Sequence, residues 1–152
     1  EVVPKETDPW RIAVALERHV KDSMRLADFS QALASAAEVA RSRRGDCTEY
    51  AVLLAAVMRS EGVPSRVAVG FAYVPNPASF APHMWTEAWI NGQWIPFDAT
   101  LGGEVNPLTR LKVTDSALSD NVTNGTLLFI PLLNLLGRAT LEILPDESPT
   151  AQ

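Results

Sequence analysis

Three residues of the types that cooperate in nucleophilic catalysis stand far apart in the chain: Cys47, His83 and Asp98. Cys47 is the only cysteine, and it follows a Gly-Asp turn at the start of a predicted apolar helix that ends at Gly62. Free backbone N–H groups and the helix dipole at such a position favour a thiolate. The competing interpretation is packing, because an isolated cysteine is commonly a small buried hydrophobic residue.

The spacing of the other two residues places them on one face of a predicted hairpin. Asn91-Gly92 is the strongest short signal for a two-residue type I′ turn, and it lies between two strand-like segments. The turn fixes the register, in which opposed residues share a face. Alternation then puts His83 one diagonal step from Asp98, so we expect a hydrogen bond between imidazole and carboxylate.

A cysteine, a histidine and an aspartate supply the three roles needed for attack on a carbonyl group. The thiolate attacks, the imidazole transfers the proton, and the carboxylate holds the imidazole in the useful tautomer. Two alternatives stay open at this point. His83 can be a core histidine with Asp98 as a strand-end cap, or Cys47 can join both as metal ligands.

Hydrophobic spacing predicts the elements that must position these residues. A helix is expected from Thr7-Asp8-Pro9 through apolar positions at three- and four-residue spacing up to Ala27. Residues 75–82 contain three prolines, which supply no ladder donors, so they are predicted to be a loop. The other predicted elements are a helix over 33–44, the Cys47 helix, a strand over 66–74, the hairpin over 83–98, a short strand over 108–113, an apolar segment over 126–136 and a last strand over 139–144.

The composition is that of one folded domain, with 47% hydrophobic and 20% charged residues. We expect a single domain over residues 1–145, followed by a polar tail over 146–152. A net charge of −5 with 13 Lys and Arg residues argues against a nucleic-acid partner, and no membrane contact is expected. The chain begins at Glu1, so we expect a piece of a longer protein. Its compartment stays open, and an exported or membrane-attached parent would fit.

Several blocks around these residues, in this order, resemble the core of the transglutaminase-like superfamily. The resemblance covers residues 30–100. It implies an α+β, papain-like transglutaminase-core fold in which the Cys-bearing helix packs against an antiparallel sheet. It also implies that Cys47 is the nucleophile, His83 the general base and acid, and Asp98 the orienting carboxylate. The blocks are residues 45–51 (GDCTEYA), 62–67 (GVPSRV), 70–71 (GF), 83–89 (HMWTEAW) and 94–100 (WIPFDAT).

The chain departs from the family pattern at three points. Ala99 stands where the family often has proline. Animal transglutaminases have a tryptophan upstream of the cysteine that helps to hold the oxyanion, whereas Trp10 is the only tryptophan upstream of Cys47 here. The Cys47 backbone N–H is therefore the expected oxyanion donor. No Asp-rich run resembles a calcium site, so neither a metal nor another cofactor is expected.

Five residues are candidates for contact with substrate. Trp85 and Glu87 share the face of the predicted general base and could form the floor of a groove, although a large aromatic residue equally serves packing. Glu49 and Tyr50 lie one turn into the cysteine helix and could flank the cleft. Phe80 lies in the Pro-rich loop, and loops on rigid scaffolds often bind substrate.

The expected reaction is acyl transfer or amide hydrolysis on a peptide or protein substrate, through a thioester. Water as acceptor makes the protein a peptidase or amidase, which we favour; a lysine amine makes it a protein cross-linking transglutaminase. A non-catalytic peptide-binding domain is the third possibility. If the catalytic interpretation holds, Cys47 should react with an alkylating reagent at pH values well below the free-thiol pKa of about 8.5. The substitution His83→Ala should remove this reactivity at low pH.

Overall fold

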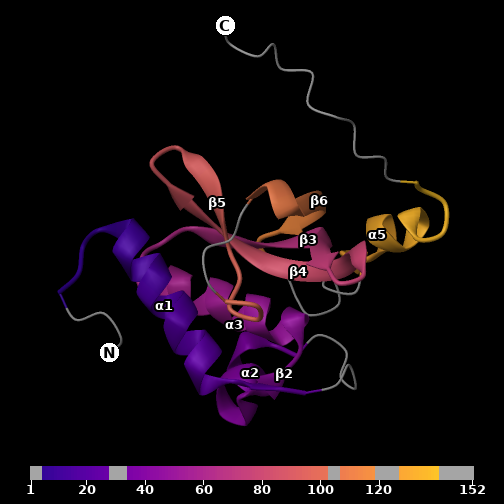
Figure 1. The fold of residues 1–152 in the computed structure, drawn as a ribbon. Helices are drawn as coiled ribbons and strands as arrows, with labels where there is room; N and C mark the ends of the chain where they lie inside the picture. Colours follow the sequence, from indigo (N-terminus) through magenta and orange to yellow (C-terminus); the bar gives the residue numbers. More distant parts are fainter. Residues whose placement is uncertain (1–4, 28–33, 103–106, 119–126, 141–152) are drawn as a thin grey trace, which may run out of the picture.

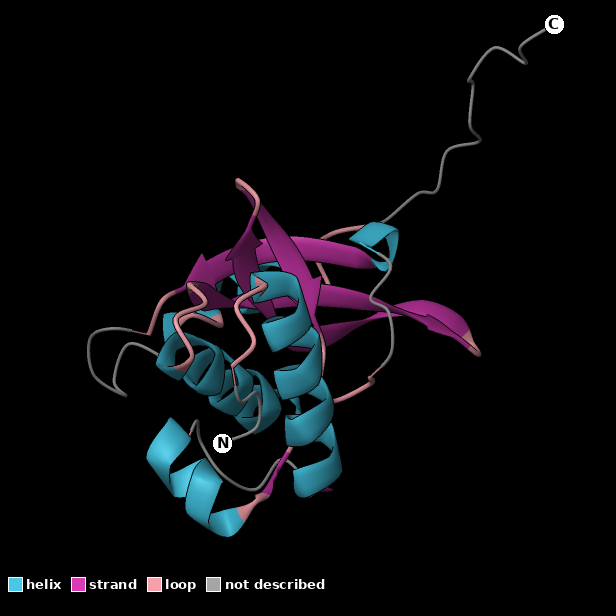
Figure 2. Ribbon diagram, turned by 90° about the vertical axis from the view of Figure 1, so that its left-hand side faces the viewer, coloured by secondary structure: helices cyan, strands magenta, loops and turns pink. Residues whose placement is uncertain are grey.

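Helices and an antiparallel sheet form two layers in the part of the chain that the computed structural model describes, residues 5–27, 34–102, 107–118 and 127–140. Helices α1, α2 and α3 lie on one side of the four-stranded sheet (Figures 1 and 2). Helix α5 (Ile130–Leu135) lies beside the end of β3 and β4 at which a turn joins these two strands (Figure 1). No helix in these residues is long and apolar enough to cross a membrane.

The first helix begins where the sequence predicts. α1 (Pro9–Ser23) is capped by Asp8, whose side chain accepts a hydrogen bond from the Trp10 N–H. It ends at Ser23 and not near Ala27, because residues 25–26 turn into the short strand β1 (Arg25–Leu26), which pairs in parallel with β2 (Arg44–Gly45). The predicted C-terminal boundary of this helix is therefore wrong by one turn.

Capping boxes start the next two helices, α2 (Ala36–Ser42) and α3 (Cys47–Ser60). In α3 the Asp46 side chain accepts from the Thr48 N–H, and the Glu49 side chain accepts from the Asp46 N–H. A Cβ atom at position 45 would overlap the Glu49 side chain, so this box needs Gly45. Cys47 is thus held as the first residue of the helix, as predicted.

The sheet has the strand order β5-β4-β3-β6, with antiparallel neighbours throughout. The predicted hairpin register is confirmed, because Ile90 pairs with Gln93 and Glu87 pairs with Pro96. Asn91 and Gly92 have φ angles of 51° and 83°, as a type I′ turn requires. The strands are β3 (Ser65–Pro75), β4 (Ala78–Ile90), β5 (Gln93–Phe97) and β6 (Arg110–Ser116), and the 3-10 helix η1 (Pro107–Thr109) precedes β6.

The predicted loop over residues 75–82 is wrong, because β3 and β4 continue through it and leave only Asn76-Pro77 between them. The Trp89 N–H bonds to the Pro64 carbonyl on the β3 side, so even-numbered residues of β4 direct their N–H groups to the opposite edge. Pro82 is such a residue, and β5 does not reach its level. Its missing N–H therefore removes no ladder hydrogen bond.

The C-terminal predictions are met in part. The strand predicted over 108–113 forms slightly later, as β6, and the apolar segment over 126–136 contains α5. Most of the last strand predicted over 139–144 lies outside the described residues, and residues 139–140 are not in a strand.

Two buried hydroxyl groups fix α3 on the sheet. Thr86 Oγ1 donates to the Ala51 carbonyl at 3.0 Å, and Ser65 Oγ donates to the Ala55 carbonyl at 2.7 Å. Ser65 pairs with Ala88 in the β3–β4 ladder, so α3 advances from Ala51 to Ala55 as β4 advances from Thr86 to Ala88. The helix and the strand that carry Cys47 and His83 therefore run in the same direction.

The substitution Thr86→Val should lower the free energy of unfolding by about 1 kcal/mol, because it removes this buried hydrogen bond while keeping the side-chain shape. Urea denaturation of both proteins measures the difference. Thr114→Val is the matched control, since the half-buried Thr114 hydroxyl makes no hydrogen bond to another described residue. Equal losses in the two variants would contradict the assigned role of Thr86.

Candidate active site

The site lies at the edge of the sheet where β5 stops. β5 ends at Phe97, opposite Thr86, so on the β5 side no strand among the described residues pairs with β4 beyond that level. Met84 is an even-numbered position of β4, and its N–H points to this open edge. The Cys47 thiol lies there and receives a hydrogen bond from that N–H. The end of α3 therefore brings the sulfur beside the residue that follows His83.

The hydrogen bond predicted between His83 and Asp98 is present. His83 Nε2 lies 2.7 Å from Asp98 Oδ2, and the two side chains are 9% and 1% exposed. Since a neutral imidazole carries its proton on one nitrogen, a hydrogen bond from Nε2 to the carboxylate leaves Nδ1 unprotonated. Nδ1 is then the nitrogen available as a base.

Asp98 accepts hydrogen bonds from three further donors. Arg110 Nη2 lies 2.7 Å from Oδ2, and the backbone N–H groups of Thr100 and Leu101 lie 3.1 and 3.2 Å from Oδ1. Burial works to raise the pKa of Asp98, but the hydrogen bond and charge of His83, together with the hydrogen bonds from Arg110 and the Leu101 N–H, outweigh it and hold the pKa below its usual value. The carboxylate is therefore ionised at neutral pH.

Sequence reasoning missed Arg110. It stands on β6, opposite Ala72 of β3, and its side chain is 9% exposed. A single arginine in a short strand gives no signal by itself. Only the strand order, in which β6 returns to lie beside β3, brings its guanidinium to Asp98.

Helix α1 holds the turn that carries Asp98. The Asp98 backbone N–H donates to Glu17 Oε1, and Lys21 Nζ donates to the Leu101 carbonyl at 3.2 Å. Burial raises the pKa of Glu17, and the nearby Asp98 charge adds to this, although the Asp98 N–H and Lys21 oppose it. Sequence reasoning also missed Glu17, which looks like an ordinary helix residue in the printed sequence.

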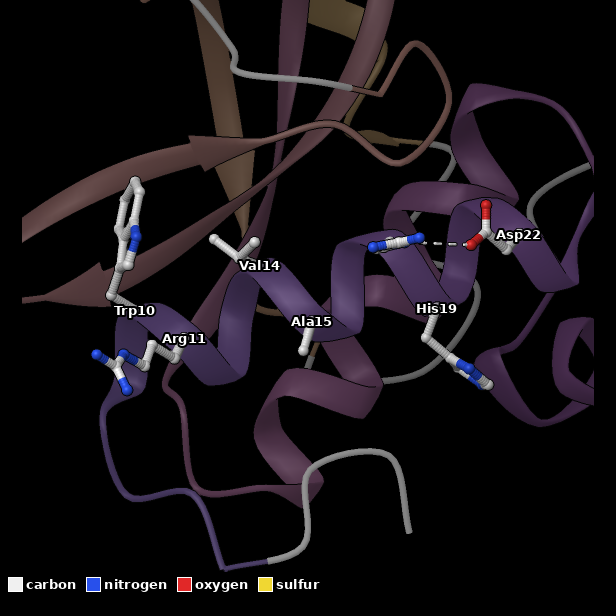
Figure 3. Close-up of a pocket in the computed structure, with 7 residues that line it drawn as sticks. Trp10, Arg11, Val14, Ala15, His19 and Asp22 are labelled. Carbon is white, nitrogen blue, oxygen red and sulfur yellow. Dashed lines mark ion pairs between the residues drawn. The ribbon is translucent and has the colours of Figure 1, made fainter.

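Trp10, the upstream tryptophan, packs against Phe97 with the ring centroids 5.6 Å apart and is 42% exposed. It borders a shallow hollow together with Val14 and His19 on the outer face of α1 (Figure 3). The residues that line this hollow all come from α1, so it is separate from the His83–Asp98 pair. These contacts give Trp10 a packing role at the end of β5.

The expectation of an acidic Cys47 thiol is wrong for this structure. Burial raises the pKa of Cys47 to about 11, and the charges of Asp46, Asp98 and Glu49 add to this. The hydrogen bond from the Met84 N–H opposes the shift but is too weak to reverse it. In the described part of the chain no hydrogen bond joins the sulfur to the His83 ring. The thiol is therefore protonated at neutral pH.

The structure places four of the five candidate substrate contacts inside the protein. Trp85 is 2% exposed and stacks on the His83 ring, with the centroids 6.4 Å apart. Glu87 is 7% exposed and forms ion pairs with Arg66 and Lys112, while Glu49 serves the α3 capping box and Tyr50 lies in the core. These contacts give all four side chains internal roles.

Phe80 is the one candidate substrate contact on an accessible surface. It is half-buried and packs edge-on against Tyr73, with the ring centroids 5.6 Å apart. The segment that holds it is a strand and not the loop that was expected.

The metal alternative finds no support in the described residues. No three His, Cys, Asp or Glu side chains there are grouped so that they could hold a metal ion. The nearest additional group at the Asp98 carboxylate is the Arg110 cation, which would repel a metal at that oxygen.

The chain and its fold match a known family. The model of the transglutaminase-like superfamily matches residues 1–99. The crystal structure of a "putative cysteine protease" from Cytophaga hutchinsonii aligns with a TM-score of 0.60 and 29% identity, over 69% of this chain and 35% of that one. The predicted family and fold class are thereby confirmed.

Two further proteins are similar to this chain. A "putative protease" from Parabacteroides distasonis shares the fold, with a TM-score of 0.50 and 18% identity over 64% of this chain and 21% of that one. An uncharacterized protein of Mycobacterium leprae is 24% identical over 127 residues, which make up 79% of this chain and 42% of that protein. This chain spans less than half the length of each relative.

Alkylation of Cys47 by iodoacetamide should be slow at neutral pH and should accelerate up to and beyond pH 10, because the pKa of the thiol is raised to about 11. Labelling rates followed by intact mass over a range of pH measure this. Cys47→Ala is the control and should not be labelled, since the chain has no other cysteine. A rate that reaches its plateau below pH 8 would instead indicate a thiolate paired with His83.

The wild-type protein should be more stable than Asp98→Asn at neutral pH, and the difference should shrink in acid. The folded-state pKa of Asp98 lies below the unfolded value of about 3.9. Its stabilising contribution is therefore present above that value and is lost as the pH falls through the folded-state pKa. Chemical denaturation at several pH values between neutral and acid measures the difference.

Asp22→Asn is the control for the Asp98 experiment, because among the described residues Asp22 pairs only with Arg18, at an exposed position, and should contribute little at any pH. A stability difference for Asp98→Asn that does not change with pH would refute the role given to the buried carboxylate.

Proposed function

The chain belongs to the transglutaminase-like superfamily, and from this premise we propose that it is an enzyme that cleaves amide bonds of peptide or protein substrates through a thioester on Cys47. The observation that carries the proposal is the 2.7 Å hydrogen bond from His83 Nε2 to Asp98, which Arg110 reinforces. In this arrangement the unprotonated Nδ1 of His83 points away from the carboxylate. The negative charge of Asp98 can stabilise the imidazolium that forms when Nδ1 takes up a proton.

The first step forms the thioester. Because the Cys47 thiol is protonated at neutral pH, its proton passes to His83 Nδ1 as the sulfur attacks the substrate carbonyl carbon. The resulting imidazolium donates a proton to the leaving nitrogen. A carbon–sulfur bond forms, the carbon–nitrogen bond breaks, and an amine departs.

The oxyanion formed during attack lies at the start of α3. The Cys47 N–H is at the first helical position, where it has no acceptor within the helix. The dipole of the helix adds a positive partial charge at the same end. This backbone group is therefore the proposed oxyanion donor.

In the second step an acceptor attacks the thioester, with His83 again as the base. Attack by water releases a carboxylic acid and restores the thiol, whereas attack by a lysine amine forms a cross-link. We favour water, because the Cytophaga hutchinsonii structure, 29% identical in the aligned region, is that of a "putative cysteine protease". The triad itself serves both acceptors.

Incubation with fluorogenic peptide amides should release the fluorophore and give a transient mass increase at Cys47. The thioester is expected because the sulfur is the nucleophile, so Cys47→Ala should show neither signal. Asp98→Asn should lower kcat/KM by about 10²- to 10⁴-fold, because the imidazole loses the group that orients it. Stopped assays analysed by mass spectrometry, with and without an added primary amine, identify the acceptor.

The Asp22→Asn variant is the matched control and should keep full activity. A product that carries the amine even at low amine concentration would assign the chain to the cross-linking class. A chain that binds peptides but never gains the acyl mass would refute catalysis and indicate a peptide-binding domain.

A further inference from the structure

An apolar groove of about 450 Å³ lies between the turn end of the β3–β4 hairpin and α5. Figure 1 shows α5 beside this end of the two strands. The floor of the groove is aromatic, from Phe71, Tyr73 and Phe80, and the wall includes Leu135 and Leu136. Its volume is in the range that proteins use for ligands of a few side chains or a small molecule.

The groove lies on the sheet face against which α3 packs. Phe80 and Met84 are both even-numbered residues of β4 and point to the same face. α3 and β4 run in the same direction, and Met84 lies beside Cys47 at the start of α3. The β4 residues that precede Met84, including Phe80, therefore lie beyond the N-terminal end of the helix.

The edge of β4 between the thiol and the groove is open. In the described residues no strand pairs with β4 on this side below the level of Thr86. Of the edge-facing positions 80, 82 and 84, Pro82 has no N–H and the Met84 N–H bonds to the Cys47 thiol, so a peptide would meet the Phe80 N–H and the backbone carbonyls of this edge. An extended peptide can add to such an edge through backbone hydrogen bonds, while pockets for alternate side chains give specificity. Phe80 lies four residues from Met84, which corresponds to about 13 Å of extended chain.

We infer that the groove binds an apolar side chain of the substrate, on the fourth residue from the amide that Cys47 attacks. The floor is aromatic, and none of the side chains that line the groove carries a charge. The occupant is therefore a large aliphatic or aromatic residue, and an acidic or small polar residue would be disfavoured. This inference rests on the proposed function, because it assumes that the Cys47 thiol is the group that attacks the substrate.

The test separates binding from catalysis by using the Cys47→Ala chain. The probes are two fluorescein-labelled peptides of the same sequence, one with Phe and one with Ser at the fourth residue from the central amide. Fluorescence anisotropy should give a Kd about tenfold or more lower for the Phe peptide, because the ring leaves water. The wild-type chain with the matching peptide amides should show the same preference in kcat/KM.

Two exposed leucines supply a matched pair of variants. Leu136 lines the groove and is 43% exposed, whereas Leu133 is 60% exposed in α5 and does not line it. Leu136→Asp should remove most of the preference for Phe, and Leu133→Asp should leave it unchanged. Circular dichroism checks that both variants are folded.

Equal affinity for the two peptides, or equal effects of the two variants, would overturn the groove assignment. Cleavage without any preference at that position would overturn it as well, while the proposed function stands. A clear Phe preference in the Cys47→Ala chain, together with a wild-type chain that never forms an acyl-enzyme, would support the groove and refute the proposed function.

Discussion

The buried Asp98 carboxylate is the group on which the arrangement of the site depends. Its two oxygens accept from His83 on β4, from Arg110 on β6 and from two backbone N–H groups of its own turn, and its backbone N–H bonds to Glu17 on α1. A buried charge is tolerated only when it is paired and hydrogen-bonded. Helix α1, strand β6 and the turn after β5 therefore all have to be packed together before the His83 imidazole is oriented.

The features that could be predicted from the sequence are those set by short-range rules. The Asn91-Gly92 turn and strand alternation were enough to place His83 beside Asp98, and the α3 cap placed Cys47 at the helix start. What could not be predicted depends on distant contacts. Arg110 and Glu17 reach Asp98 only through the packing of β6 and α1, and the strand pairing through the prolines depends on which edge of β4 is left open.

The thiol shows why local signals can give the wrong sign. A helix N-terminus favours a thiolate, yet burial and three nearby carboxylates raise the pKa of Cys47 to about 11. Neither burial nor the approach of Asp98 is visible in the residues around position 47. Phe80 and Trp85 both lie close to His83 in the sequence, but Phe80 is half-buried whereas Trp85 is fully buried. This difference in solvent exposure could not be predicted from their positions in the sequence.

The short length of β5 has a consequence for how this protein can tolerate insertions and deletions. Between Gly92 and Asp98 a change of one residue would turn the carboxylate to the other face, and a change of two would keep the face but move it past His83. A longer β5 would also place a carbonyl where the Met84 N–H now meets the sulfur. The count of residues in this segment is therefore as constrained as the identity of the residues at the site.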